Sequence, residues 1–185
     1  LAAIVPLRRS GWNVPESAIR DGLAAAACPA RIEVIPPQRG RESVLVIDTA
    51  HNLASIQALA DVMREQFAGR RAWLIFAATQ EKDLRGMLEV VLACFDEVVL
   101  TRYTENPRAV PPEHLAALAE TISGHRPPTA ANPAEAWRMV VDRASSADVV
   151  CVAGSFYLAA EIRRLAMPLI GGSPPQGVDN RLAAD

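Results

Sequence analysis

The sequence lacks the features that mark several large functional classes. Its 185 residues carry a formal net charge of -2, so electrostatics gives no case for binding nucleic acid or an anionic membrane. No apolar run approaches the roughly 20 residues that span a bilayer, and no basic-then-apolar signal segment stands at its start. The length suits one sizeable core and is short for two full domains. These absences favour a soluble, cytoplasmic protein that binds neither membrane nor nucleic acid.

Cysteine and histidine are scarce and have no metal-binding pattern. The cysteines Cys28, Cys94 and Cys151 are far apart and form no C-x-x-C pair, which argues against a zinc site and a disulfide framework. We expect reduced, partly buried thiols, as in cytoplasmic proteins. No two histidines have the spacing of metal ligands, and His114 and His125 fall in or near an expected surface helix. The sequence therefore predicts no metal site of its own.

Two common phosphate-binding signatures are also missing. The chain has no G-x-x-x-x-G-K-[ST] loop, so it lacks a Walker-type phosphate cradle. No G-x-G-x-x-G follows an expected strand, which weighs against dinucleotide binding. Lysine is nearly absent, since Lys82 is the only lysine among 19 basic residues. A single ammonium in a chain that otherwise uses arginine makes Lys82 a candidate for a specific role.

The chain alternates apolar strands with amphipathic helices. Strands are expected at 31–35, 44–47, 72–77, 97–101 and 148–153, and helices at 53–67, 83–94, 111–122, 132–144 and 155–165. Such alternation implies parallel strands joined by right-handed crossovers. The sequence therefore predicts an α/β fold, a Rossmann-like three-layer domain with a mostly parallel sheet. Residues 1–27 look helical but not self-contained, and the Gly-, Pro- and Ser-rich tail from 171 is expected to be mobile.

The most informative segment is 44–52, where an apolar run ends at Asp48 and a His51-Asn52 pair follows. Ligands bind at the carboxyl ends of buried parallel strands in α/β proteins. A carboxylate there can hydrogen-bond ribose hydroxyls, and an imidazole can contact a phosphate or an acidic substrate. The alternative is that Asp48 only caps a helix and that His51 is a satisfied loop histidine.

Three other residues are candidates for anion binding, each with a plainer alternative. Arg31 opens a strand and suits phosphate or carboxylate recognition, unless it is a solvated strand-end arginine. Ser155 follows Gly154 at a strand-to-helix junction, where a hydroxyl and free backbone N–H groups can hold a carboxylate. Its alternative is an ordinary helix N-cap. Lys82 follows another strand and suits a substrate carboxylate, unless it is a surface lysine beside Asp83 as a helix cap.

Four short strings occur in one order along most of the chain. They are P-A-R-I-E at 29–33, D-T-A-H-N-L at 48–53, A-A-T-Q-E-K-D at 77–83 and G-S-F-Y at 154–157. Together they resemble the C-terminal domain of the Mur ligase superfamily, within it the folylpolyglutamate synthases, including the bifunctional dihydrofolate synthase form. That family shows P-G-R-x-E, D-G-A-H-N-P, a small-residue turn ending in K-D, and G-S-x-Y.

The resemblance implies a function as well as a fold. Such ligases use ATP to join an amino group to a carboxylate through an acyl phosphate. The substrates would be L-glutamate and a folate or pteroate, and the P-loop and Mg²⁺ ligands would belong to a central domain. By family match Arg31 would reach the ATP phosphates and Asp48 the ribose. His51, Lys82 and Ser155 would lie on the glutamate and phosphate side, and no residue is assigned as catalytic.

The resemblance also implies a domain layout. Residues 1–28 would be the end of the preceding central domain and a linker, 29–170 the Mur-ligase-type C-terminal domain, and 171–185 a flexible tail. We then expect a fragment of a ligase, monomeric, cytoplasmic and inactive by itself because it lacks the P-loop.

The sequence departs from the family pattern at three positions. Ala30 and Thr49 replace glycines, and Leu53 replaces a proline. These departures keep open the alternative of a stand-alone, non-catalytic nucleotide-binding module. A C-terminal domain of a cell-wall Mur ligase is a further alternative. The strand at 31–33 and the turn at 154–157 favour the folate branch. The acceptor and the length of the glutamate chain are left open.

Overall fold

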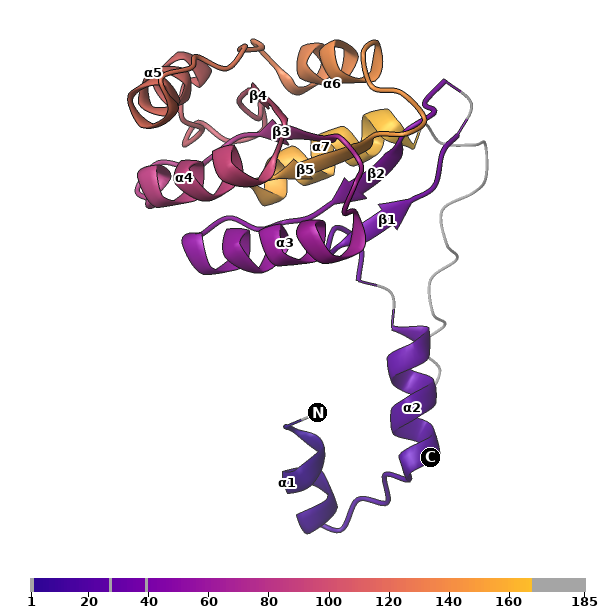
Figure 1. Cartoon of the computed structure of the whole chain (residues 1–185). Coiled ribbons are helices and arrows are strands. Elements are labelled where there is room, and N and C mark those ends of the chain that lie inside the picture. Colours follow the sequence, from indigo (N-terminus) through magenta and orange to yellow (C-terminus); the bar gives the residue numbers. More distant parts are fainter. Residues whose placement is uncertain (1, 27, 39, 168–185) are drawn as a thin grey trace.

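The computed structural model describes residues 2–26, 28–38 and 40–167. In chain order the elements are α1 (Ile4–Arg9), α2 (Glu16–Ala25), β1 (Glu33–Ile35), β2 (Val44–Ile47), α3 (Leu53–Gln66), β3 (Ala72–Phe76), α4 (Leu84–Cys94), β4 (Glu97–Leu100), α5 (Pro112–Ser123), α6 (Pro133–Val141), β5 (Val149–Ala153) and α7 (Phe156–Ala166). The strands form one sheet in the order β1-β2-β5-β3-β4 (Figure 1). Only β1 is antiparallel to its neighbour. The predicted α/β fold with a mostly parallel sheet is confirmed.

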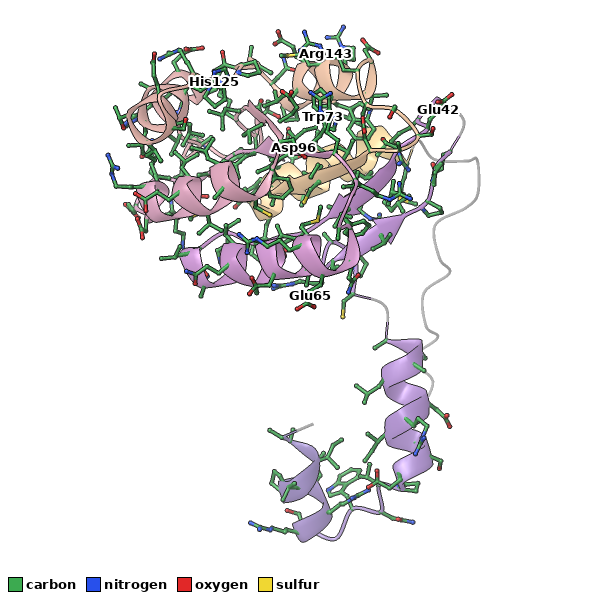
Figure 2. The ribbon with its side chains drawn as sticks, viewed as in Figure 1. Glu42, Glu65, Trp73, Asp96, His125 and Arg143 are labelled. Carbon is green, nitrogen blue, oxygen red and sulfur yellow. The ribbon has the colours of Figure 1, made fainter. Side chains whose placement is uncertain are left out.

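Helices cover both faces of the sheet. The core on one face contains residues of α3, α4 and α5, and the core on the other contains residues of α6 and α7. Along β2, Val46 belongs to the first core, whereas Leu45 and Ile47 belong to the second, as the two-residue period of a strand requires. Figure 2 shows side chains filling both spaces, with Trp73 of β3 on the side of α6. Burial on both faces explains the continuous apolar runs and gives the predicted three layers.

The central strands end in register. Ile47 of β2 and Ile75 of β3 both pair with Val152 of β5, which lies between them. The segments that follow β2, β3 and β5 therefore leave the sheet at one edge. Two of these segments lead directly into helices α3 and α7, so two helix N-termini lie at that edge.

Two predicted boundaries differ from those observed by more than one residue. The sequence predicts a strand from 31, but β1 begins at Glu33 because Ile32 has a φ of 47°, outside the β region. The helix predicted to reach Ala144 ends at Val141. There the N–H groups of Arg143 and Ala144 both donate to the Val140 carbonyl, which closes a turn and ends the regular helical ladder.

The amino-terminal helices stand apart from the sheet. Neither α1 nor α2 buries a residue, and Figure 1 shows both away from the domain. Trp12 and Leu23 leave 67% and 58% of their surface exposed. Pro15 is the N-cap of α2. No described residue of the sheet domain buries these side chains.

Two expectations from the sequence concern the membrane and the tail. None of the described helices combines the length and the apolar character needed to cross a membrane. The tail predicted to be mobile, 171–185, lies outside the described residues.

Candidate functional site

Hydrogen bonds tie the three central strand ends together. The Asp48 amide donates to the Val152 carbonyl at 3.0 Å, and the Gly154 amide donates to the Ala50 carbonyl at 2.7 Å. The segment after β5 therefore lies beside the segment after β2. This contact brings the D-T-A-H-N-L and G-S-F-Y strings, about a hundred residues apart in sequence, to one place.

Gly154 is required by this close approach. Its φ is 103°, which disfavours any residue with a side chain. A Cβ at Gly154 would overlap the Ala77 carbonyl oxygen and come within 2.7 Å of the Phe76 ring. The glycine thus lets the turn after β5 pass between the ends of β2 and β3.

Asp48 does not cap a helix. It is 7% exposed, and each carboxylate oxygen accepts a backbone hydrogen bond, Oδ2 from Ile32 at 2.8 Å and Oδ1 from Ala50 at 2.6 Å. The cap of α3 is Asn52, whose side chain accepts from the Ser55 amide at 2.9 Å. Asp48 therefore joins the turn before β1 to the turn after β2.

The turn before β1 presents Arg31 from a strained backbone. Ala30 and Ile32, on either side of Arg31, have φ values of 56° and 47°. Such angles are uncommon without glycine and unusual for a β-branched residue. Asp48 holds Ile32, and Glu33 holds Ala30 through a 2.8 Å hydrogen bond from its amide. The strain is maintained by two carboxylates, and Arg31 is left exposed.

The three departures from the family strings are accommodated here. Ala30, in place of glycine, keeps the left-handed backbone, and its carbonyl accepts from the Thr49 amide at 2.9 Å. Thr49 is buried, and its hydroxyl has no hydrogen-bond partner within the described part of the chain. Leu53, in place of proline, is the first residue of α3, a position that other residues fill readily.

Glu33 anchors the strained turn to α7. The Arg163 guanidinium donates to both its carboxylate oxygens, with N–O distances of 2.9 to 3.1 Å. This hydrogen bonding lowers the pKa of the Glu33 carboxyl, helped by the Ala30 amide and opposed by partial burial. The sequence assigned Glu33 no role beyond its place in the P-A-R-I-E string. Its partner lies 130 residues away, so no local signal could have revealed the anchor.

His51 is half-buried at the start of the turn into α3. Its Nδ1 lies 2.9 Å from the Thr49 carbonyl oxygen. A carbonyl can only accept, so Nδ1 carries a proton, and Nε2 is the ring nitrogen left open to a ligand. Nδ1 has a hydrogen-bond partner, as the alternative of a satisfied loop histidine requires. Nε2 has no hydrogen bond to any described residue.

Phe156 is a second residue whose role the sequence did not reveal. The Arg31 guanidinium lies 5.5 Å from the centre of its ring, and the His51 ring lies 4.9 Å away. Phe156 begins α7 and is 48% exposed. An exposed aromatic residue directly after a glycine-serine turn was the available signal.

Ser155 and Lys82 occupy different surroundings. Ser155 is 1% exposed and caps α7, its hydroxyl accepting from the Tyr157 amide at 3.2 Å, so the N-cap alternative describes its observed contact. Lys82 is exposed, and within the described residues no hydrogen bond or ion pair joins it to the other four candidates. Beside it, Asp83 caps α4 as the alternative predicted, accepting from the Gly86 amide at 2.9 Å.

The sequence predicts no metal-binding pattern. Among the described residues, no group of three His, Cys, Asp or Glu side chains is arranged to hold a metal ion. The three cysteines are free, with Cys28 exposed, Cys94 partly buried and Cys151 buried. Burial raises the pKa of the Cys94 and Cys151 thiols, which keeps them protonated and unreactive.

The arrangement defines a Rossmann-like domain with a polar, partly cationic site at the carboxyl edge of its parallel strands. The model of the family described as "Mur ligase, glutamate ligase domain" matches residues 30–156, more than half of the chain. The chain belongs to this family.

Individual proteins that are similar to this chain include ligases. The dihydrofolate synthase/folylpolyglutamate synthase of Escherichia coli is 28% identical over 160 residues, 86% of this chain and 36% of the relative. A solved structure, E. coli FolC in complex with DHPP and ADP, has a TM-score of 0.78 at 27% identity, covering 89% of this chain and 37% of that one. A cell-wall relative from Alkalilimnicola ehrlichii, the UDP-N-acetylmuramoyl-L-alanyl-D-glutamate–2,6-diaminopimelate ligase, is 34% identical over 131 residues, 68% of this chain and 25% of the relative.

The relatives are much longer than the matched region. The chain spans about a third of the length of the first curated relatives it matches. The family and the fold are therefore those of one domain, and the activity of such a whole ligase involves further residues.

Proposed function

We propose that this chain is the C-terminal domain of an ATP-dependent ligase that joins L-glutamate to a folate or pteroate. The observation that carries the proposal is the meeting of Arg31 and His51 beside Phe156, at the strand edge of a domain of the glutamate ligase family. Folate–glutamate ligases are among its relatives, and one solved relative is in complex with DHPP and ADP. Residues 29–170 form the domain in this proposal, and 1–28 connect it to a central domain.

The reaction transfers the terminal phosphoryl group of ATP to the acceptor carboxylate, leaving ADP and an acyl phosphate. The glutamate amine then attacks the acyl carbon, an amide bond forms, and inorganic phosphate leaves. Every species in this sequence is anionic, and the site offers what anions need. It has an exposed guanidinium in Arg31 and the N-termini of α3 and α7, and the His51 Nε2 can donate to an anion when it carries a proton.

The residues present fit part of a nucleotide site. The planar fork of Arg31 suits a phosphate group, which it can bind with two parallel hydrogen bonds. Asp48 fits the ribose less directly, because each of its oxygens already accepts a backbone hydrogen bond. Each oxygen keeps a second lone pair, so a ribose hydroxyl can still donate to it. Asp48 then has two tasks, holding Arg31 in place and contacting the ribose.

The glutamate side of the site involves His51, Lys82 and Ser155. The Lys82 ammonium can bind a carboxylate or a phosphate, and so can the His51 Nε2 atom when it carries a proton. Ser155 contributes mainly by fixing the first turn of α7, since its hydroxyl is buried. Mg²⁺ would be held by the central domain together with a P-loop, so the 185-residue chain alone is expected to be inactive. A monomer in the cytoplasm remains the predicted state.

The proposal is tested with the full-length gene product. The coding sequence upstream of Leu1 should contain a G-x-x-G-K-[ST] loop. Purified full-length protein should release ADP only when L-glutamate and a folate or dihydropteroate are both present. A matched reaction containing a UDP-muramoyl peptide and diaminopimelate serves as the control for the cell-wall alternative.

The outcomes separate the three candidate functions. ADP release that depends on folate and glutamate supports the proposal. Release that depends instead on the muramoyl peptide would assign the chain to a cell-wall ligase. A reading frame without a P-loop, and no ADP release with either acceptor, would leave a non-catalytic nucleotide-binding module.

A further inference from the structure

Phe156 contacts the two side chains that give the site its basic character. The Arg31 guanidinium lies over its ring at 5.5 Å from the centroid, and the His51 ring packs at 4.9 Å with a tilt of 46°. Arg31 and His51 come from separate turns, one before β1 and one after β2. The single ring at the start of α7 is therefore shared by a guanidinium and an imidazole from two different strand connections.

Contacts other than the one between the rings fix the backbone before Phe156 and the ring of His51. Phe156 follows Gly154, which is held between two strand ends, and Ser155, which is buried. The Nδ1 atom of His51 is bound to the Thr49 carbonyl. A rigid ring on a rigid helix start can hold long or rotatable side chains that contact it.

Of the two side chains that contact Phe156, the Arg31 side chain depends more on that contact for its position. Its backbone is clamped on either side of the residue, but its guanidinium makes no hydrogen bond or ion pair with any described residue. The ring face of Phe156 is the contact that the structure gives it. A guanidinium stacked on an aromatic face loses part of its rotational freedom before any ligand arrives.

The neighbouring aromatic residue cannot replace Phe156. Tyr157 stacks on Tyr103 with ring centroids 5.1 Å apart, and the Tyr103 hydroxyl lies 2.8 Å from the Thr79 hydroxyl. Tyr157 thus connects α7 to the segments after β3 and β4. The two consecutive aromatic residues serve different parts of the strand edge.

We propose that Phe156 is a positioning residue that holds Arg31 and His51 in a preformed anion site before ATP binds. The inference rests on the proposed function and deepens it. It assigns a role to the variable position of G-S-x-Y, which the family string leaves open. It also predicts that an aromatic ring, and not merely an apolar side chain, is needed there.

Kinetics of the full-length protein test whether Phe156 contributes to ATP binding. Phe156→Leu should raise the KM for ATP about two- to fivefold, the size of one exposed cation–π contact, with a smaller effect on kcat. Phe156→Trp keeps an aromatic face and should retain a KM near the wild-type value. Leu165→Ala removes another exposed apolar side chain of α7, 42% exposed, and should leave both constants unchanged.

NMR of the 185-residue chain tests the contact without depending on catalysis. The ring of Phe156 should impose ring-current shifts on the His51 ring protons and on the Arg31 side chain. Both shifts should disappear in Phe156→Leu and persist in Phe156→Trp. His114 and His125 are exposed and distant in sequence, and their signals should not move.

Opposite results would overturn the inference. Unchanged His51 and Arg31 signals in Phe156→Leu would show that the ring does not hold them. Equal KM values for wild type and Phe156→Leu, or an equal rise in Phe156→Trp, would remove the positioning role. A full-length protein without ligase activity would refute the proposed function instead, and the NMR signals would still decide whether Phe156 positions the two side chains.

Discussion

The Ile32 amide donates a 2.8 Å hydrogen bond to Oδ2 of Asp48, a residue 16 positions further along the chain. Ile32 has a left-handed backbone that a β-branched residue rarely adopts. A carboxylate at a strand end thus stabilises the strained turn that presents Arg31. Two motif residues, which sequence comparison places in separate strings, form one structural unit.

The first prediction concerns Asp48→Asn. Asparagine can accept only one of the two backbone hydrogen bonds and turns an amide N–H₂ toward the other donor. We expect a loss of about 1–3 kcal/mol in unfolding free energy, the cost of a buried unpaired group. We also expect a higher KM for ATP, because Arg31 loses its support. Urea unfolding and ATP kinetics of the full-length protein measure the two effects.

The control for Asp48 is Asp61→Asn. Asp61 lies on the exposed face of α3 in a surface pair with Arg64. Its substitution should change stability by no more than about 0.5 kcal/mol. Wild-type ATP kinetics in Asp48→Asn and Asp48→Ala would remove Asp48 from the nucleotide site.

The second prediction separates a steric requirement from a backbone preference. Gly154→Ala should prevent correct folding or cost about 3 kcal/mol or more, because its Cβ would overlap the Ala77 carbonyl. Gly124→Ala is the matched control, since Gly124 also has a positive φ, 72°, but open space around it. It should cost only about 1–2 kcal/mol. Thermal unfolding of both variants gives the difference, and equal losses would contradict the close approach at Gly154.

The third prediction is a pH dependence that arises from Glu33. Its folded pKa is lowered below the usual 4.5, chiefly by hydrogen bonds from Arg163. The unfolded chain therefore binds more protons in the acid range, and stability rises with pH there. This contribution is fully present above pH 4.5 and is lost as the pH falls through the lowered folded pKa.

Glu33→Gln tests this dependence. The variant should be less stable by about 1–3 kcal/mol at pH 7, and the gap to wild type should narrow as the pH drops toward 3. Glu65→Gln, an exposed position on α3 labelled in Figure 2, should track wild type at every pH. A gap between Glu33→Gln and wild type that stays constant from pH 7 to pH 3 would argue against an ionised Glu33–Arg163 pair.

The fourth prediction concerns Lys82. Its side chain is exposed, so Lys82→Ala should leave the unfolding free energy within about 0.5 kcal/mol of wild type. If the ammonium binds the glutamate carboxylate, the KM for glutamate should rise roughly tenfold or more, the loss of one charge-assisted hydrogen bond. Arg85→Ala, on the exposed side of the following helix, is the control. An unchanged glutamate KM would exclude Lys82 from the site.

Much of the fold could be predicted because it depends on local pattern. The apolar runs of β2, β3 and β5 are continuous since both faces of the sheet are covered, and the intervening helices have clear apolar faces. The start of β1 could not be predicted, because the backbone of Ile32 is set by Asp48 across the sheet edge. Local propensity gives way there to a tertiary hydrogen bond.

The candidate site was predictable in part for the same reason. Ends of parallel strands share an edge, so the residues after β2 and β5 come together, and Asp48, His51 and Ser155 lie there. The contacts of Phe156 and Glu33 were not foreseen, because their partners are distant in sequence and side-chain packing selects them. The place of Lys82 relative to the others remains a prediction.

The central claim is that this domain serves a ligase that extends folates with glutamate. The most direct measurement is mass spectrometry of a folate after incubation with ATP, L-glutamate and the full-length protein, alongside the Arg31→Ala variant. The account predicts a product larger by one or more glutamyl residues with wild type and far less product with Arg31→Ala. A folate of unchanged mass in the wild-type reaction, under conditions where the protein is folded and binds ATP, would contradict it.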